Sequence, residues 1–299
     1  MVPSASGCVA MFVDYLRFRR DIGDYGQPVL ERFVLGKKAD QGLCEDAIFC
    51  GDRFVAVIDG VTSKGHLSYR GKTSGRYAAE MLVDAFERID RVKGDWLPKE
   101  VLKELDKSLG RAMKEVASSL GEDIGVEDYL RASVVYYDRA LKAVVDYGDC
   151  QCRIGDAVHT HAKLIDQVLS ERRAAVLWER LEGGASVDEL LSEDPGREAI
   201  LPDLLRQLRY ENVPGVYGYP VLNGHGICEE MIVVHPVSAG ERVVLCSDGY
   251  PEVCSTREKS ERYLRKVIEE DPLLMSLHPS TKGVLAGQQS FDDRAWVSL

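Results

Sequence analysis

The sequence predicts an α+β fold, a layered sandwich of antiparallel β-strands with helices packed against them. Apolar runs of strand length come in hairpin-like pairs, separated by turns that contain Asp or Gly. Two helical segments stand between the first and the second group of these strands. A parallel doubly wound sheet would instead require strands and helices in regular alternation.

The first strands are expected in VLERFVLG and in AIFCGDRFVAVIDG, the second of which folds as a hairpin at Gly51 and Asp52. A helix from about Ser74 to Ile89 follows, because its apolar residues recur at helical spacing. Pro98 suits the first turn of a second helix, which runs to about Leu120. Three strands are then expected in ASVVYYD, ALKAVVDYGD and CRIGDAVHTH.

Residues 164–224 break this succession of strands with three helical segments, LIDQVLSERRAAVLWERL, ASVDELLSE and REAILPDLLRQLRY. They form a helical insert, in which Arg172 and Arg173 look exposed. Strands resume with ICEEMIVVHPV and ERVVLCSDG, a helix spans about Thr256 to Glu269, and FDDRAWVSL closes the chain as the last strand. Residues 1–27 look like an N-terminal extension, so the domain is expected to span residues 28–299.

The composition limits the possible partners. A chain of 299 residues with 45% hydrophobic content can bury a large core, and its net charge of −11 argues against a nucleic-acid partner. Eight cysteines without CxxC spacing indicate a reducing, cytoplasmic setting. No signal-peptide core is recognisable, and no apolar run approaches the about 20 residues that span a bilayer, so we expect no membrane partner.

Acidic residues at the ends of predicted strands point to a metal site. Asp59 in FVAVIDG, Asp248 in RVVLCSDG and Asp292 in SFDDRAWV lie far apart in sequence but at equivalent places, so a sheet could bring them together. An acidic pair also precedes an apolar run in CEDAIF, and a further Asp lies in DYGDCQCRIG. Clustered carboxylates repel one another unless a proton or cation intervenes, and hard oxygen ligands suit Mg²⁺ or Mn²⁺.

The ordered set of ED, DG, GD, SDG and DD resembles the metal-dependent serine/threonine phosphatases of the PPM (PP2C) family over roughly residues 30 to 299. The resemblance implies a four-layer α-β-β-α sandwich of two antiparallel sheets flanked by helix pairs, with the metal-binding carboxylates at one edge. It also implies that residues 164–224 are a flap beside the active site. The alternative is an insert that merely packs on the sheet edge.

The resemblance also assigns roles to residues. Asp59 corresponds to the carboxylate that bridges two metals, and the carbonyl of Gly60 to a further ligand. The second metal would be held by Asp248 and Asp292, and the residues near its bound water would be Glu45 and Asp46. Asp149 corresponds to the ligand of a third, weaker ion. The implied activity is hydrolysis of phosphoserine or phosphothreonine in a phosphoprotein, by a water activated between two Mg²⁺ or Mn²⁺ ions.

The chain departs from the family pattern at two places. Gln41 stands where the family has an Arg that grips the substrate phosphate, and Val61 stands where it has a His that is a candidate general acid. Lys37, Lys38 or an Arg from elsewhere could occupy the space of the missing Arg. His66 could replace the missing acid, or it is only a solvated loop residue.

Other interpretations remain open. A degenerate phosphatase could bind a phosphopeptide or partner without efficient turnover. A P-loop nucleotide hydrolase is a weaker alternative, because GHLSYRGKTSG has one residue too many between Gly65 and Gly71. His159 and His161 share a strand face at a spacing that would suit Zn²⁺, but no third ligand is near in sequence and a polar outer face is the simpler interpretation. Cys150 and Cys152 are expected to pack in the core.

Overall fold

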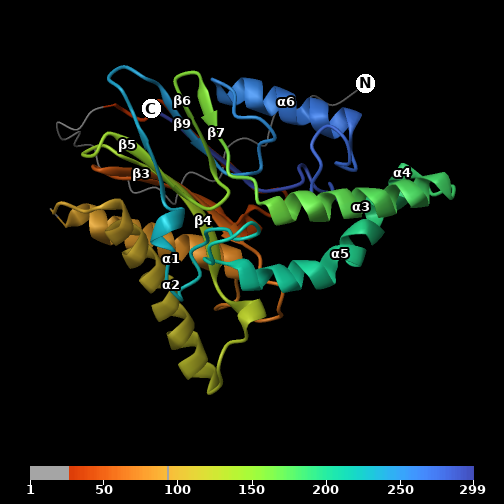
Figure 1. The fold of residues 1–299 in the computed structure, drawn as a ribbon, viewed down its shortest axis with the longest axis horizontal. Helices are drawn as coiled ribbons and strands as arrows, with labels where there is room; N and C mark the ends of the chain where they lie inside the picture. Colours follow the sequence, from red (N-terminus) through yellow and green to blue (C-terminus); the bar gives the residue numbers. More distant parts are fainter. Residues whose placement is uncertain (1–26, 93) are drawn as a thin grey trace, which may run out of the picture.

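Two antiparallel sheets form the centre of the protein, in a computed structural model that describes residues 27–92 and 94–299 (Figure 1). One sheet has the order β1 (Glu31–Leu35), β10 (Arg294–Ser298), β9 (Val243–Cys246), β6 (Gln151–Ile154) and β7 (Ala157–His159). The other has the order β2 (Asp46–Cys50), β3 (Phe54–Val61), β4 (Arg131–Asp138), β5 (Ala143–Tyr147) and β8 (Val233–Pro236). The predicted antiparallel sandwich is confirmed. The expected N-terminal extension lies outside the described residues, apart from Gln27.

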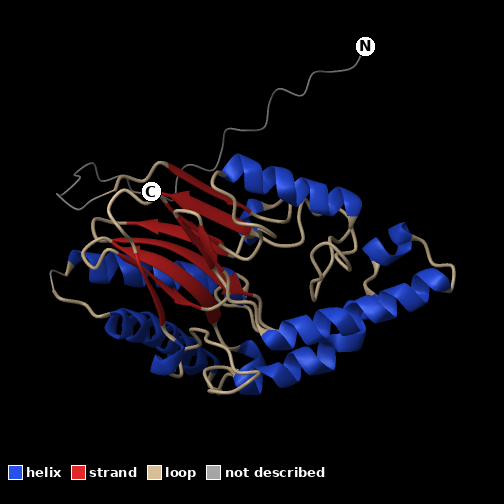
Figure 2. Cartoon of the chain, turned by 45° about the horizontal axis from the view of Figure 1, so that its top comes forward, coloured by secondary structure: helices blue, strands red, loops and turns tan. Residues whose placement is uncertain are grey.

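Helices cover both outer faces of the sandwich, as Figure 2 shows. The pair α1 (Ser74–Arg91) and α2 (Pro98–Leu120) packs on the β2–β8 sheet, and α6 (Arg257–Glu270) lies on the β1–β7 sheet. A second helix beside α6, as the expected helix pairs would require, is not seen between residues 27 and 299. The helical insert comprises α3 (Leu164–Glu182), α4 (Val187–Ser192) and α5 (Pro195–Arg206). Short 3₁₀ turns are η1 (Gln41–Leu43), η2 (Val126–Asp128), η3 (Gln207–Tyr210) and η4 (Glu229–Met231).

Strand β3 explains why apolar runs in this chain are continuous rather than alternating. Phe54, Ala56 and Ile58 belong to the core beneath α1 and α2. Val55 and Val57 belong to the core between the two sheets, because successive side chains of a strand point to opposite faces. Both faces of this strand are therefore buried, and a two-sided apolar strand needs a layer on each side.

The predicted turns and helix ends are largely confirmed. Strands β2 and β3 pair antiparallel across the loop that contains Gly51 and Asp52, and α2 spans Pro98–Leu120. The segment CRIGDAVHTH, expected as one strand, is instead a hairpin of β6 and β7, because Gly155 adopts a φ of 56° and reverses the chain. Cys150 and Cys152 are buried between the sheets, as expected.

Strand pairing gathers four chain segments at one edge of the sandwich. Asp59 near the end of β3 lies opposite Asp46 at the start of β2. Strand β9 ends at Cys246 beside Trp296 of β10, so the loop after β9 and the loop before β10 emerge together. None of the described helices is long and apolar enough to cross a bilayer.

Candidate metal centre

Three aspartates from distant segments meet at this edge. Carboxylate oxygens of Asp59, Asp149 and Asp248 all lie within 4.8 Å of one another. Asp59 belongs to β3, Asp248 follows β9 by two residues, and Asp149 follows β5 by two residues. The sandwich therefore brings together the acids that the sequence places at equivalent strand ends.

The negatively charged carboxylates of this cluster repel one another. Burial raises the pKa of Asp59 well above its ordinary value, and the negative charges of Asp248 and Asp46 raise it further. Burial likewise raises the pKa of Asp46, to which Asp293 and Asp248 contribute. A proton or a cation is needed to neutralise such a group of carboxylates.

Unpartnered oxygen atoms show where a cation would fit. Glu45 Oε1, Asp46 Oδ2 and Asp248 Oδ1 are buried without a hydrogen-bond partner in the described structure. Most buried polar atoms in proteins have a partner, so three orphaned carboxylate oxygens at one edge require an explanation. The donors are all oxygen atoms, which suits Mg²⁺ or Mn²⁺. The residues present therefore fit the divalent ions that the sequence predicts.

Glu45 is held in place from several sides. Its Oε2 accepts a hydrogen bond from the Thr62 hydroxyl, and its amide donates to Asp293 Oδ2 at 2.9 Å. Its carbonyl accepts a hydrogen bond from the Gly60 amide at 3.1 Å. These contacts fix the acidic pair against the end of β3, which carries Asp59, and against the residue before β10.

Two glycines permit the close approach of backbones here. A Cβ at Gly60 would lie 2.1 Å from the carbonyl oxygen of Gly75 in α1, and one at Gly249 would lie 2.0 Å from the carbonyl oxygen of Asp293. Both distances are shorter than a carbon and an oxygen can approach. Gly in the DG and SDG sequences therefore serves packing of the site, in addition to turn formation.

Asp292 and Asp149 are each bound by lysines. Asp292 Oδ1 receives Lys37 Nζ at 2.8 Å, and its Oδ2 receives Lys282 Nζ. Lys163 Nζ lies 2.5 Å from Asp149 Oδ2. Burial acts to raise the pKa of Asp149, but the contact with Lys163 outweighs it and lowers the pKa. The structure thus places Asp292 in an ion-pair network, and the cluster of three aspartates does not include it.

Lys282 and two further cations, Lys64 and Arg197, belong to segments that the sequence did not single out, and the charge of Lys282 interacts with Asp59 and Asp248. Burial lowers the pKa of Lys64 to about 7, and the charges of Arg197 and Lys282 act in the same direction. Arg197 lies near the start of α5 and donates to the carbonyl of Thr281 at 2.9 Å. No local pattern marks these cations, because they come from loops and helix starts that only the fold brings together.

The residues predicted to bind the substrate phosphate differ in how close they lie to the acidic residues of the site. Lys37 reaches the centre through Asp292, as described above. Gln41 instead braces its own loop, since its Oε1 accepts from the Gly36 amide at 2.7 Å and its Nε2 donates to the Lys38 carbonyl at 2.7 Å. The side chain of Lys38 is exposed. His66 is exposed on the loop between β3 and α1, and no contact in the described part of the chain joins it to the acids.

The helical insert departs from expectation at Arg173. Arg172 is exposed and pairs with Asp203, but Arg173 is 1% exposed and binds Asp194 at 2.8 Å and the Ser280 carbonyl at 3.0 Å. Its position follows from the packing of α3 against the segment after α6, where Leu177 and Met275 share a small core. The expectation that both arginines are exposed was wrong for Arg173.

The P-loop alternative is not supported. Lys72 Nζ pairs with Glu80 on α1 at 2.5 Å, and its backbone forms an antiparallel bridge with Tyr69. The preceding strand β3 lies between antiparallel neighbours.

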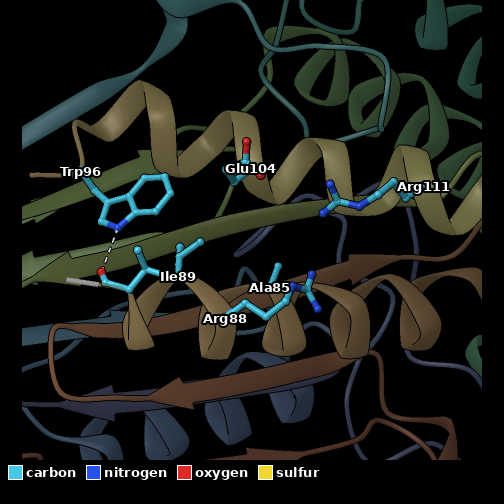
Figure 3. A pocket seen from close by; sticks show the side chains of 7 residues that line it. Ala85, Arg88, Ile89, Trp96, Glu104 and Arg111 are labelled. Carbon is cyan, nitrogen blue, oxygen red and sulfur yellow. Dashed lines mark hydrogen bonds between the residues drawn. The ribbon is translucent and has the colours of Figure 1, made fainter. Parts of the chain in front are cut away.

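A pocket of about 210 Å³ between α1 and α2 is lined by Ala85, Arg88, Ile89, Val92, Trp96, Glu104 and Arg111, and contains none of the clustered acids (Figure 3).

No protein-family model and no curated protein matches the chain. Solved structures that are similar to it include serine/threonine phosphatases. The catalytic domain of PstP in complex with two manganese ions is 18% identical, with a TM-score of 0.47 and coverage of 90% of this chain and 97% of that chain. Stp1 from Staphylococcus aureus is 13% identical, with a TM-score of 0.46 and coverage of 95% and 98%. PstP/Ppp of Mycobacterium tuberculosis is 17% identical, with a TM-score of 0.44 and coverage of 91% and 98%.

Proposed function

We propose that this chain is a PPM-type metal-dependent phosphatase that hydrolyses phosphomonoesters, with phosphoserine or phosphothreonine in a protein as its substrate. The observation that carries the proposal is the group of Asp59, Asp149 and Asp248, with unpartnered carboxylate oxygens beside it, at one edge of an antiparallel sandwich. Such an oxygen-rich, negatively charged group is suited to divalent cations.

Asp59, the carbonyl of Gly60 and Asp248 would hold the ions, with Asp292, Glu45, Asp46 and Asp149 around them. If Mg²⁺ or Mn²⁺ ions were bound there, they would supply Lewis acidity and would lower the pKa of a water molecule for attack on phosphorus. Lys37 and Lys282 are bound to the two oxygens of Asp292 and would compete with an ion for them.

Lys64, Lys282 and Arg197 are candidates to bind the substrate phosphate in place of the family's arginine. A dianionic phosphoryl group needs positive charge at an acidic site. The charges of Arg197 and Lys282 both act on Lys64, and the charges of Asp59 and Asp248 act on Lys282. We infer that these three cations bind the phosphate in place of the residue that Gln41 replaces.

Hydrolysis of p-nitrophenyl phosphate in Mn²⁺ tests the activity. We expect turnover that chelator abolishes and that Asp59→Asn reduces at least about a hundredfold, the usual scale for losing a major electrostatic element. Turnover that survives both treatments would contradict the proposal.

The phosphate site is tested by the KM for p-nitrophenyl phosphate, which Lys64→Ala should raise and Lys72→Ala should leave unchanged. The P-loop interpretation expects the reverse.

A degenerate phosphatase that binds phosphoproteins is the second candidate. The observation in its favour is that lysines already pair with Asp292 and Asp149, so two of the predicted ligands are neutralised without metal. The two candidates differ in a titration with a phosphoserine peptide. Binding without chelator sensitivity, together with no hydrolysis in Mn²⁺, would favour the binding module.

A further inference from the structure

A second cluster of potential metal ligands lies away from the carboxylate edge. Ligand atoms of Asp146, His161 and His235 all lie within 4.8 Å of one another. Asp146 belongs to β5, His235 to β8, and His161 follows β7 by two residues. A fourth potential ligand, His159 at the end of β7, stacks on His235 with ring centroids 4.0 Å apart. The two histidines that share a strand face in the sequence thus find their missing partners in other strands.

The position of the cluster follows from the sheet order. Strand β7 is the edge strand of one sheet and β8 the edge strand of the other. Asp146 lies two residues after Val144 on β5, so both side chains point to the same face of the sheet. Val144 belongs to the core between the sheets, and Asp146 therefore faces that space as well. His235 lies opposite Val144 in the β5–β8 register and faces that space as well. The cluster therefore lies where the two open sheet edges meet.

The polar atoms of this cluster are not satisfied by the protein alone. Asp146 is 1% exposed, and neither of its carboxylate oxygens has a hydrogen-bond partner in the described structure. His161 Nε2 lies 2.9 Å from Asp146 Oδ2 and forms an ion pair with it when the imidazole is protonated. His235 Nε2 is also buried without a partner. A buried carboxylate, an imidazole nitrogen beside it and a second, unpartnered imidazole nitrogen converge on one point and resemble the ligand set of a cation site.

We propose that Asp146, His161 and His235 form a zinc site that joins the edges of the two sheets, with His159 as the nearest candidate for a fourth ligand. Two imidazole nitrogens and one carboxylate oxygen are ligands that Zn²⁺ takes, whereas Mg²⁺ and Mn²⁺ favour the oxygen-only donors of the other centre. The ligands come from both sheets, so a bound ion would cross-link the open side of the sandwich. The site is independent of the proposed phosphatase activity.

Zinc titration by calorimetry tests the site, in protein that carries Asp59→Asn so that the carboxylate centre is weakened. We expect one Zn²⁺ per chain. His161→Ala and His235→Gln should each weaken binding at least about tenfold, the loss that even outer partners of ligands can cause. The matched control is His225→Ala, because His225 is an exposed imidazole that stacks on Tyr129 outside the cluster. Equal Zn²⁺ affinity in all four proteins would overturn the proposal.

Cobalt absorption provides a test that needs no histidine variant. Co²⁺ bound by imidazoles in a four-coordinate site gives intense visible bands, whereas Co²⁺ in a six-coordinate oxygen site gives weak ones. We expect intense bands that Zn²⁺ removes and that Asp59→Asn leaves unchanged. Weak bands alone, or bands that vanish with Asp59→Asn, would mean that the histidine cluster binds no metal. Neither result depends on whether the protein hydrolyses phosphate esters.

Discussion

Replacing Asp248 by Asn should stabilise the metal-free protein and abolish its stabilisation by Mn²⁺. Asp248 lies within 4.8 Å of Asp59 and Asp149, measured between carboxylate oxygens. At that separation and an effective dielectric constant of about 20, two carboxylates repel by roughly 3 kcal/mol. Asn removes this charge, and no hydrogen bond is lost at Oδ1 because that atom has no partner.

The net gain is smaller than the full repulsion. Asp149 is already neutralised in part by Lys163, and the raised pKa of Asp59 lets a proton relieve the cluster. The substitution also removes an attraction for Lys282. We therefore expect a gain on the order of 1 to 3 kcal/mol in chelator. In a domain of this size that corresponds to an increase in Tm of roughly 2 to 10 °C.

Metal should offset most or all of this difference between the two proteins. A ligand at a hundred times its Kd stabilises by about 2.7 kcal/mol, so Mn²⁺ should raise the Tm of the unaltered protein and leave that of Asp248→Asn nearly unchanged. Thermal unfolding in chelator and in Mn²⁺ measures both effects. Asp52→Asn is the control, since it removes an exposed acid from the β2–β3 hairpin. A lower Tm of Asp248→Asn in chelator, or an unchanged response to Mn²⁺, would refute this account of the cluster.

Protonation adds a pH signature to the same cluster. The folded-state pKa of Asp59 is raised, so the folded metal-free protein holds a proton that the unfolded chain has released. This contribution to stability is full below the ordinary pKa of 3.8 and is lost as the pH rises through the raised pKa. Asp248→Asn should make the Tm in chelator less dependent on pH over that window.

Three further predictions concern other parts of the molecule. Arg173→Met should lower the free energy of unfolding, measured in urea, by about 3 to 5 kcal/mol, because it leaves buried Asp194 unpaired. Arg172→Ala, at an exposed ion pair, should cost less than about 1 kcal/mol. Equal losses in the two variants would contradict the burial of Arg173. Burial raises the pKa of Asp146 from 3.8 to about 6, so its charge destabilises the fold fully above pH 6 and not below pH 3.8. Asp146→Asn should therefore gain up to about 3 kcal/mol at pH 8 in chelator and nothing at pH 4, and a gain at both pH values would contradict the assignment. Gly249→Ala should destabilise by about 1 to 3 kcal/mol by urea unfolding, since its Cβ meets the Asp293 carbonyl, and an unchanged midpoint would argue against that close approach.

The order of elements could be read from the sequence because it depends on local patterns. Apolar runs bounded by Gly51 and Asp52 predict a hairpin, and Pro98 predicts the start of a helix, because both effects act within a few residues. The gathering of Asp59 and Asp248 also followed from the sequence, since strand ends of one sandwich share an edge and both residues lie at strand ends. Nothing in this reasoning required knowledge of side-chain contacts.

Only the tertiary structure decided which partner each charged side chain has. Arg173 and its exposed neighbour Arg172 are indistinguishable in the sequence, but packing of α3 on the segment after α6 buries only the first. Asp292 fits the pattern of a metal ligand, but it is bound by lysines from two other loops. The histidines of β7 lacked a third ligand until the sheet order brought His235 and Asp146 beside them. The physical reason is the same in each case: a charge or ligand partner is set by distances between segments remote in the chain, and these distances exist only once the layers have packed.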